Sequence, residues 1–139
     1  MLPSYVKPQP WYFEYLPWLS RQHGTTILQN IYLRRDIFKD LKSPNPSPRN
    51  IAVLEHEMTH YKRIKQMGIL KFSMKYLLSG KFRFNEELIA NKNAFKILKK
   101  NTMEQDLDKK AQLLSGWLYL WPVPYKFAKE ELKKAWEDA

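Results

Sequence analysis

Clear start and stop signals frame residues 47–68, and this segment constrains the fold more than any other part of the chain. Residues 43–48 alternate proline with serine and asparagine, which is typical of a loop, and Ser47 followed by Pro48 is a common helix start. Gly68 stands where many helices end in a left-handed residue. We therefore expect a helix over about residues 48–67. Two neighbouring stripes recur there at helical spacing: Ile51, Leu54, Met58 and Tyr61 in one, and Val53, His56, Glu57, His60 and Ile64 in the other.

The remaining patterns predict an α+β, helix-dominated fold with a small β element and about five helices. Even spacing of apolar side chains from Thr25 to Leu33 predicts one strand or a short hairpin that breaks near residues 29–30. A Thr-x-x-Gln capping box at residues 102–105 predicts the start of a helix that prolines end after Trp121. The other helices are expected at about residues 69–78, 85–100 and 125–136.

Length and composition favour one domain over residues 1–139, because 139 residues with 44% apolar content can bury about two-thirds of their unfolded surface. We divide it into a proline-rich and aromatic arm at 1–23, a core at 24–100 and C-terminal helices at 101–139. The chain does not open with a basic stretch running into an apolar one, and no apolar run reaches the ~18 residues of a membrane-spanning helix. We expect a soluble, cytoplasmic protein without a transmembrane segment; its oligomeric state stays open.

Aromatic side chains gather in two segments. We expect the first to form an ordered arm packed on the domain and the second, residues 117–121, to complete the core or to wall a cleft. The alternative for both is a patch at a membrane interface, the boundary that Trp and Tyr prefer. The members of the first segment are Trp11, Tyr12, Phe13, Tyr15 and Trp18.

Residues 56–60, His-Glu-Met-Thr-His, carry the most specific chemical signal. Positions four apart lie on one helix face, so His56 and His60 can reach one ion while Glu57 points beside them. The chain has no cysteine, so a metal site must use His, Asp or Glu. A catalytic zinc ion needs three protein ligands and one open position for water, and an adjacent Glu can act as the general base. We expect zinc at the two histidines and assign the general base to Glu57.

The third ligand decides the subclass of zinc site. The longer motif with a third His needs Gly at position 63 and His at 66, but the chain has Arg63 and Gln66, which excludes that class. His23 is a weak candidate because it precedes the predicted strand in a turn. Glu86 and Glu87 are the only acids between His60 and Glu104, and either one can ligate while its neighbour favours the helix dipole.

The segment from Gly24 to about Leu98 resembles the gluzincins, zinc peptidases whose third ligand is a Glu on a later helix, and in particular their very small bacterial and phage members. Residues 87–90, Glu-Leu-Ile-Ala, match the Glu-x-x-Ala context of that ligand, so the resemblance implies Glu87 rather than Glu86. Many gluzincins place Asp after this motif to orient a zinc-bound His. This chain has Asn91, an amide that polarises an imidazole less.

The resemblance implies a zincin-like domain with one Zn²⁺ per chain that hydrolyses peptide bonds in a protein or peptide substrate. A developing oxyanion also calls for a hydrogen-bond donor. The candidates are four tyrosines, among which the sequence does not choose: Tyr61, Tyr76, Tyr119 and Tyr125. The apolar region around residues 27–33 is either a purely structural strand or an edge on which an extended substrate pairs.

Charge is concentrated in one third of the chain. The net charge is +10, and residues 61–100 hold eleven Lys and Arg against two acids, a surplus of nine. Such a block is either a solvated set of helix faces or a docking site for an anionic partner, nucleic acid or membrane. The alternative function is therefore a weakly active or inactive zincin-like binding module. DNA-associated proteases of the SprT type use a third His, for which this chain offers no suitable residue.

Overall fold

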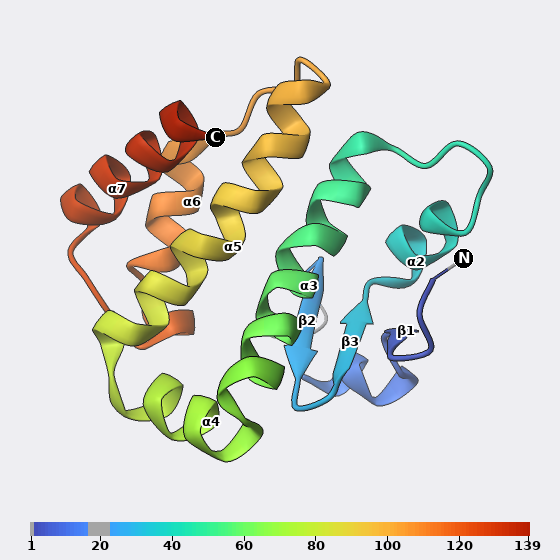
Figure 1. The fold of residues 1–139 in the computed structure, drawn as a ribbon, viewed down its shortest axis with the longest axis horizontal. Helices are drawn as coiled ribbons and strands as arrows, with labels where there is room; N and C mark the ends of the chain where they lie inside the picture. The colour runs from blue at the N-terminus through green and yellow to red at the C-terminus, as the bar shows by residue number, and fades with distance from the viewer. Residues whose placement is uncertain (1, 17–22) are drawn as a thin grey trace.

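The computed structural model of the chain describes residues 2–16 and 23–139 and has a helix-dominated architecture with one three-stranded sheet (Figure 1). This confirms the expected α+β class. The helices are α2 (Arg35–Leu41), α3 (Pro48–Met67), α4 (Ile69–Leu78), α5 (Gly80–Lys100), α6 (Leu107–Leu114) and α7 (Tyr125–Asp138), and two short 3-10 segments are η1 (Trp11–Tyr15) and η2 (Trp117–Tyr119). Within the described ranges, no helix has the length and apolar character needed to cross a bilayer.

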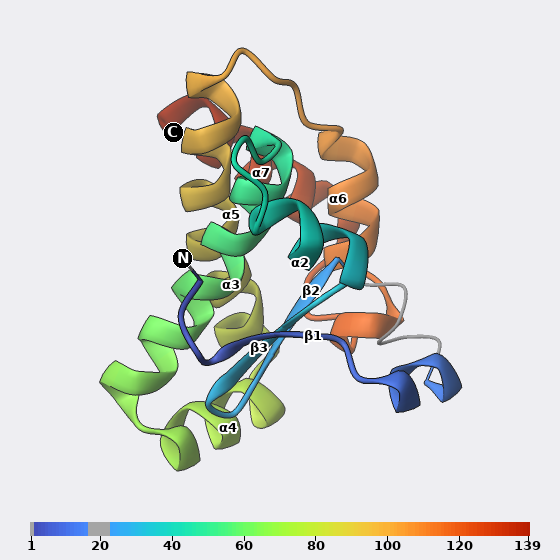
Figure 2. The ribbon, with the colours of Figure 1, turned by 90° about the vertical axis from the view of Figure 1, so that its right-hand side faces the viewer.

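The sheet has the strand order β1-β3-β2, with β1 (Val6–Pro8) parallel to β3 (Asn30–Leu33) and β2 (Gly24–Ile27) antiparallel to it. Of the two expected alternatives, one strand or a short hairpin, the structure has the hairpin: Ile27 pairs with Asn30, and the turn between them places Leu28 at a φ of 53°. Strand β1 and helix α2 were not expected. Figure 2 shows the three strands side by side below α2.

Helix α3 has the predicted bounds, but its start is held by a residue from another element. The side chain of Ser47 makes no capping hydrogen bond. The carboxylate of Asp40, near the end of α2, instead accepts hydrogen bonds from the Ser47 backbone N–H at 2.9 Å and from Asn50 Nδ2 at 2.8 Å. Gly68 ends the helix at a φ of 93°, a conformation that favours glycine.

Two predicted helix starts are wrong. Helix α5 begins at Gly80 rather than near Asn85, because the Ser79 hydroxyl caps it by accepting a hydrogen bond from the Phe82 N–H. Helix α6 begins at Leu107, where Asp106 accepts from the Lys109 N–H, whereas Thr102 has a φ of 54° and caps nothing.

Helix α6 also ends much earlier than expected, at Leu114. Residues 116–121 then form a tight turn in which the Trp121 N–H donates to the Gly116 carbonyl at 3.0 Å. Trp117 and Trp121 are 62% and 69% exposed and do not complete the core as expected, whereas Tyr119 of the same segment packs against the core. In the arm, Phe13 is buried, but Trp11, Tyr12 and Tyr15 are exposed, and Trp18 lies outside the described residues.

Helices α3 and α5 lie side by side at the centre, with the sheet and α2 beyond α3 and with α6 and α7 beyond α5 (Figures 1 and 2). A small apolar cluster between the sheet and α3 is built from Val6, Ile31, Leu33 and Ile37, against which Leu54, Met58 and Tyr61 pack. A larger cluster joins α5 to α6 and α7 and includes Phe84, Phe95, Leu98, Leu114 and Leu132. The interface between α3 and α5 therefore lies between two apolar clusters.

Candidate metal centre

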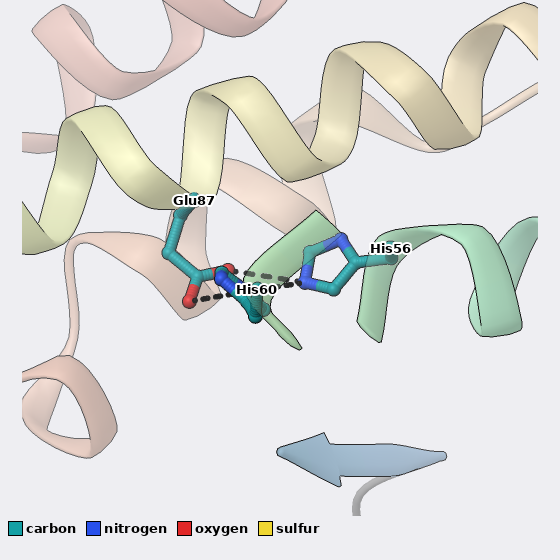
Figure 3. A group of neighbouring side chains, drawn as sticks. All are labelled: His56, His60 and Glu87. Carbon is teal, nitrogen blue, oxygen red and sulfur yellow. Dashed lines mark hydrogen bonds and ion pairs between the residues drawn. The ribbon is translucent and has the colours of Figure 1, made fainter. Parts of the chain in front are cut away.

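Three side chains from the two central helices converge on one point (Figure 3). His56 and His60 stand one turn apart on α3, and their Nε2 atoms are 3.2 Å apart. Glu87 of α5 faces both, with Oε2 at 3.2 Å from His56 Nε2 and Oε1 at 3.2 Å from His60 Nε2. These are the two histidines and the glutamate that the motif and the resemblance indicated.

The separations match those of ligands to one small metal ion. Two atoms bound at about 2.1 Å to a tetrahedral ion lie about 3.3–3.4 Å apart. The two imidazole nitrogens, 3.2 Å apart, are close to that value. Each imidazole meets a different oxygen of Glu87, and with one atom per residue the three groups lie within 4.8 Å of one another. Among the described residues, this is the one group of three or more His, Asp or Glu side chains with the geometry to hold a metal ion.

The hydrogen bonding of Glu87 also fits a metal ligand. Its side chain is 5% exposed, and its Oε2 is one of two buried side-chain polar atoms in the described part of the chain that lack a hydrogen-bond partner. A buried carboxylate oxygen that lies 3.2 Å from one imidazole nitrogen but has no hydrogen bond of its own leaves a lone pair for a cation. A metal ion at this point would satisfy it.

The charges of the three groups are strongly coupled. Burial by itself lowers the pKa of His60, but the negative charge of Glu87 and a hydrogen bond with it outweigh burial and raise the pKa to about 9. Burial raises the pKa of Glu87, but the facing imidazoles more than offset it and hold this pKa well below its usual range. Without a cation, the site therefore holds a protonated imidazole against a carboxylate.

Glu86, the other candidate ligand, points elsewhere. It is 2% exposed, and both of its oxygens accept hydrogen bonds from Arg63 of α3, Nε to Oε2 and Nη2 to Oε1, each at 2.6 Å. Adjacent residues on a helix are rotated by about 100°, so two neighbouring carboxylates can meet different partners. Arg63 was noted in the sequence only as a departure from the longer motif; its role as the partner of a buried acid was missed.

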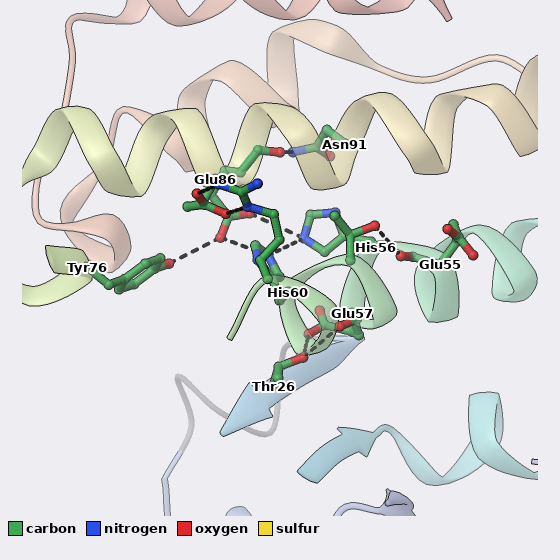
Figure 4. A network of polar contacts seen from close by, with 11 residues as sticks. Thr26, Glu55, His56, Glu57, His60, Tyr76, Glu86 and Asn91 are labelled. Carbon is green, nitrogen blue, oxygen red and sulfur yellow. Dashed lines mark hydrogen bonds and ion pairs between the residues drawn. The ribbon is translucent and has the colours of Figure 1, made fainter. Parts of the chain in front are cut away.

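Glu57 faces the edge of the sheet beside the site (Figure 4). Its Oε2 accepts a hydrogen bond from Thr26 of β2 at 2.7 Å, and the same hydroxyl donates to the Glu57 carbonyl at 3.1 Å. The close approach depends on Gly24, where a Cβ would lie 3.0 Å from Glu57 Cγ and 2.9 Å from Leu33 Cδ2. The charge of Glu57 contributes to the raised pKa of His60, so its carboxylate lies within electrostatic range of that imidazole.

The four tyrosine candidates separate into two pairs. Tyr76 of α4 donates a hydrogen bond to Glu87 Oε1 at 3.1 Å, and burial together with the charge of Glu87 raises its pKa. Burial and the same charge raise the pKa of Tyr119 well above its usual value. In contrast, Tyr61 stacks on Tyr5 at 4.0 Å between ring centroids, and Tyr125 donates to Asp108 at 2.9 Å. Tyr76 and Tyr119 are therefore the neutral donors beside the centre.

Asn91 lies one turn after Glu87 on α5 and is 1% exposed. Its Nδ2 donates to the Glu87 carbonyl at 2.8 Å, and its Oδ1 is the second buried polar atom without a hydrogen-bond partner among those described. It does not accept a hydrogen bond from either imidazole here. The expectation that Asn91 orients a zinc-bound His therefore stays a prediction.

Of two residues outside the expected 24–100 core, Lys110 lies near the site and His23 does not take part in it. Lys110 of α6 is half-buried; burial lowers its pKa, and the charges of Glu87 and Glu57 oppose that change. Its ammonium group therefore lies in the field of the site, although no local pattern around residue 110 indicated this. His23 is exposed and does not belong to the metal-holding group.

A cleft of about 760 Å³ lies away from the converging ligands, between the β2–β3 turn and the junction of α3 with α4. Of the candidate site residues, it includes only Tyr61. No protein-family model matches the chain, and searches of curated proteins and of solved structures returned no significant match.

Proposed function

We propose that this protein is a zinc-dependent peptidase with a zincin-like arrangement, in which His56, His60 and Glu87 hold one Zn²⁺ and Glu57 is the general base. The observation that carries the proposal is the convergence of two imidazole Nε2 atoms, 3.2 Å apart, on one carboxylate whose two oxygens each lie 3.2 Å from one of them. Two neutral nitrogens and one oxygen form the ligand set of a catalytic zinc ion with an open fourth position. The resemblance to gluzincins favours the same ligand set.

The residues around the three ligands support a hydrolytic step. Zinc bound here would polarise a peptide carbonyl and lower the pKa of a water molecule towards ~7. Glu57 takes the proton of the attacking water and passes it to the departing amine, and Thr26 orients its carboxylate through the 2.7 Å hydrogen bond. Tyr76 or Tyr119, each protonated at neutral pH, donates to the oxyanion.

The substrate is proposed to be an extended peptide that lies along β2. This strand is at the edge of the sheet, and Thr26 ties it to Glu57. Pairing of a peptide backbone with an edge strand presents successive carbonyls along one line without requiring a particular sequence. Residues that flank β2 would determine which substrate side chains are preferred.

Zinc content is the first test of the proposal. Elemental analysis of the purified wild type is expected to give one zinc per chain, with loss of zinc in Glu87→Gln and retention in the matched variant Glu86→Gln. No zinc in the wild type after supplementation would refute the metal site. Equal loss in both variants would refute the assignment of Glu87.

Hydrolysis of an unfolded protein such as casein is the second test. Zinc-loaded wild type is expected to cleave it. Glu57→Gln is expected to keep zinc and to cleave about 10²–10⁴-fold more slowly. Glu55→Gln on the same helix is the control and is expected to keep the rate. Zinc binding without any hydrolysis would favour the alternative, a zincin-like binding module whose basic region docks an anionic partner.

A further inference from the structure

Helix α4 presents its largest apolar side chains to solvent. Leu70, Met74, Leu77 and Leu78 are 76%, 53%, 67% and 77% exposed. At about 100° per residue, these positions fall within one stripe that follows the helix axis. Scattered exposed apolar residues are ordinary on a protein surface, but a continuous stripe on one helix marks a contact face.

The orientation of α4 is fixed by its opposite side. Phe72 is 6% exposed and packs against Tyr76 and Phe82, with ring centroids 5.7 and 5.4 Å apart. Tyr76 donates to Glu87, and Arg83 Nη1 donates to the carbonyls of Tyr76 and Leu77 at 2.7 and 2.9 Å. Turning the apolar stripe inward would break these contacts, so the exposed stripe is the outer face of a firmly held helix.

Positive charge borders the stripe. Lys71 and Lys75 are exposed on α4, beside the leucines in the helical projection, and Lys81 is exposed just after it. Residues 61–85 hold seven Lys and Arg and no Asp or Glu. The surface around α4 is thus apolar at its centre. Every charged residue that the 61–85 segment contributes to it is cationic.

The turn around η2 lies beside the end of α4. Arg83 Nε donates to the Tyr119 carbonyl at 3.0 Å while its Nη1 holds the last turn of α4, and the Gly80 position is packed against Pro122. This turn exposes Trp117, Leu120 and Trp121 at 62%, 53% and 69%. Tryptophan near an amphipathic basic helix is typical of a surface that enters the headgroup region of a bilayer.

We propose that the outer face of α4, with Leu70, Met74, Leu77 and Leu78 at its centre and Lys71, Lys75 and Lys81 at its border, docks on the surface of an anionic lipid bilayer. Apolar side chains enter the boundary of the acyl chains, and the lysines contact lipid phosphates and carboxylates. The helix lies in the plane of the interface. It does not span the bilayer.

The observations favour a bilayer over two other occupants. A nucleic acid would use the lysines but leave four large apolar side chains in water, because its backbone offers them nothing to pack on. A second copy of the chain would bring two acid-free cationic borders together at the same face, which like-charge repulsion opposes. An anionic membrane surface satisfies both the apolar and the cationic part of the face.

Docking through this face would also hold the proposed active site close to the membrane surface. Tyr76 projects from the inner side of α4 to Glu87, so the metal centre lies about one helix diameter, ~10 Å, from the docked surface. The docking itself is independent of the proposed peptidase activity. If both hold, the substrate is a protein segment presented at a membrane surface.

Sedimentation with vesicles tests the proposal without any activity measurement. The full chain is expected to bind vesicles of phosphatidylcholine mixed with phosphatidylserine and not vesicles of phosphatidylcholine alone. Leu70→Ser combined with Leu77→Ser is expected to weaken binding at least about tenfold. Leu113→Ser is the matched control, because Leu113 is a leucine of α6 that is 46% exposed and belongs neither to the apolar stripe of α4 nor to its cationic border, and this variant is expected to leave binding unchanged.

Charge variants keep the test valid if the leucine variant folds poorly. Lys71→Gln and Lys75→Gln replace exposed side chains, and each is expected to weaken binding about fivefold. Failure of the wild type to bind the mixed vesicles would overturn the proposal, as would equal losses in Leu113→Ser and the leucine pair. Tighter binding to a duplex DNA probe than to vesicles, unaffected by the leucine variants, would assign the face to nucleic acid. A concentration-dependent dimer that the leucine pair abolishes would assign it to a second copy.

Discussion

Two neighbouring parts of the interface between α3 and α5 bury acidic side chains in opposite ways. At one, Glu86 meets Arg63, and both carboxylate oxygens accept hydrogen bonds of 2.6 Å from one guanidinium. At the other, Glu87 meets His56 and His60, and its Oε2 accepts no hydrogen bond although it is buried. The two acids are consecutive in the sequence, yet only the first has its bonding capacity filled by protein.

This difference indicates what each region does. A buried carboxylate held by two charge-assisted hydrogen bonds joins two helices and leaves nothing for a ligand. A buried carboxylate that shares its position with two imidazoles and keeps one oxygen unsatisfied has a stability cost that a cation would remove. The Arg63–Glu86 pair is therefore structural, and the site proposed for zinc lies beside it on the same two helices.

The strongest test of the comparison is stabilisation by zinc. Free zinc at about a thousand times its Kd stabilises a single-site protein by about 4 kcal/mol, which raises Tm by roughly 12 °C for a chain of this size. Glu87→Gln is expected to lose this rise and Glu86→Gln to keep it. Calorimetry with zinc and with chelator measures both. A full rise in Glu87→Gln would contradict the distinction between the two acids.

The metal-free protein is expected to show a pH dependence that belongs to the His60 and Glu87 pair. The pKa of His60 in the folded protein, about 9, exceeds its unfolded value of about 6.5. The stabilisation of the fold by protonated His60 is therefore complete below pH 6.5 and is lost as the pH rises through 9. The lowered pKa of Glu87 reflects the same interaction. Its stabilising effect is present above the ordinary pKa of a carboxylate and is lost in acid. Unfolding free energy should fall by about 3 kcal/mol between about pH 6 and pH 10.

Urea denaturation in the presence of chelator checks this dependence. Because Glu87→Gln removes the partner of His60, its stability is expected to change much less over the same range. An equal fall in the wild type and in Glu87→Gln would assign the effect to other groups.

Breaking the structural pair is expected to cost less and to spare the metal. Glu86→Gln replaces a buried carboxylate with an amide that cannot accept both guanidinium hydrogen bonds. Since Arg63 is 33% exposed and regains water, we expect a loss of about 2–3 kcal/mol. Chemical denaturation measures it. A loss below about 0.5 kcal/mol would show that the pair does not join the helices.

The smallest expected effect concerns the donor from α4. Tyr76→Phe should lower kcat about tenfold or more while zinc content is unchanged, because it removes a neutral donor beside the centre. Tyr125→Phe is the control, because the hydroxyl of Tyr125 on α7 contacts Asp108 on α6. If Tyr119→Phe carries the loss instead, the donor is Tyr119.

Local patterns predicted the helix of the motif well. The bounds of α3 and α4 follow from Pro48, Gly68 and the Ser79-Gly80 pair, which act through short-range backbone geometry. The same signals did not identify the group that holds the start of α3: the Ser47 side chain makes no capping hydrogen bond, and Asp40, seven residues earlier on α2, accepts from the Ser47 N–H instead. Thr102 failed as a cap because its backbone adopts a positive φ.

The orientation of α4 was not predictable from its own residues. Apolar side chains occur on nearly all of its sides, so periodicity alone allowed Leu70 or Phe72 to face the core. Contacts with Tyr76, Phe82 and Arg83 decided it, and they left the leucines outside. The burial of Tyr119 and Lys110 near the site has the same origin, because both come from segments distant in sequence.

The sequence by itself determined the pair of histidines and the glutamate between them, because residues four apart on a capped helix must share a face. It also limited the main candidates for a third ligand to two adjacent acids. The tertiary structure decided which of the two acids faces the histidines. Consecutive side chains on α5 differ by about 100° in direction, and the rotation of α5 about its axis is set by the burial of Phe84, Phe95 and Leu98 against other helices. Packing of apolar residues far from the site thus turns Glu87 towards the histidines and Glu86 towards Arg63.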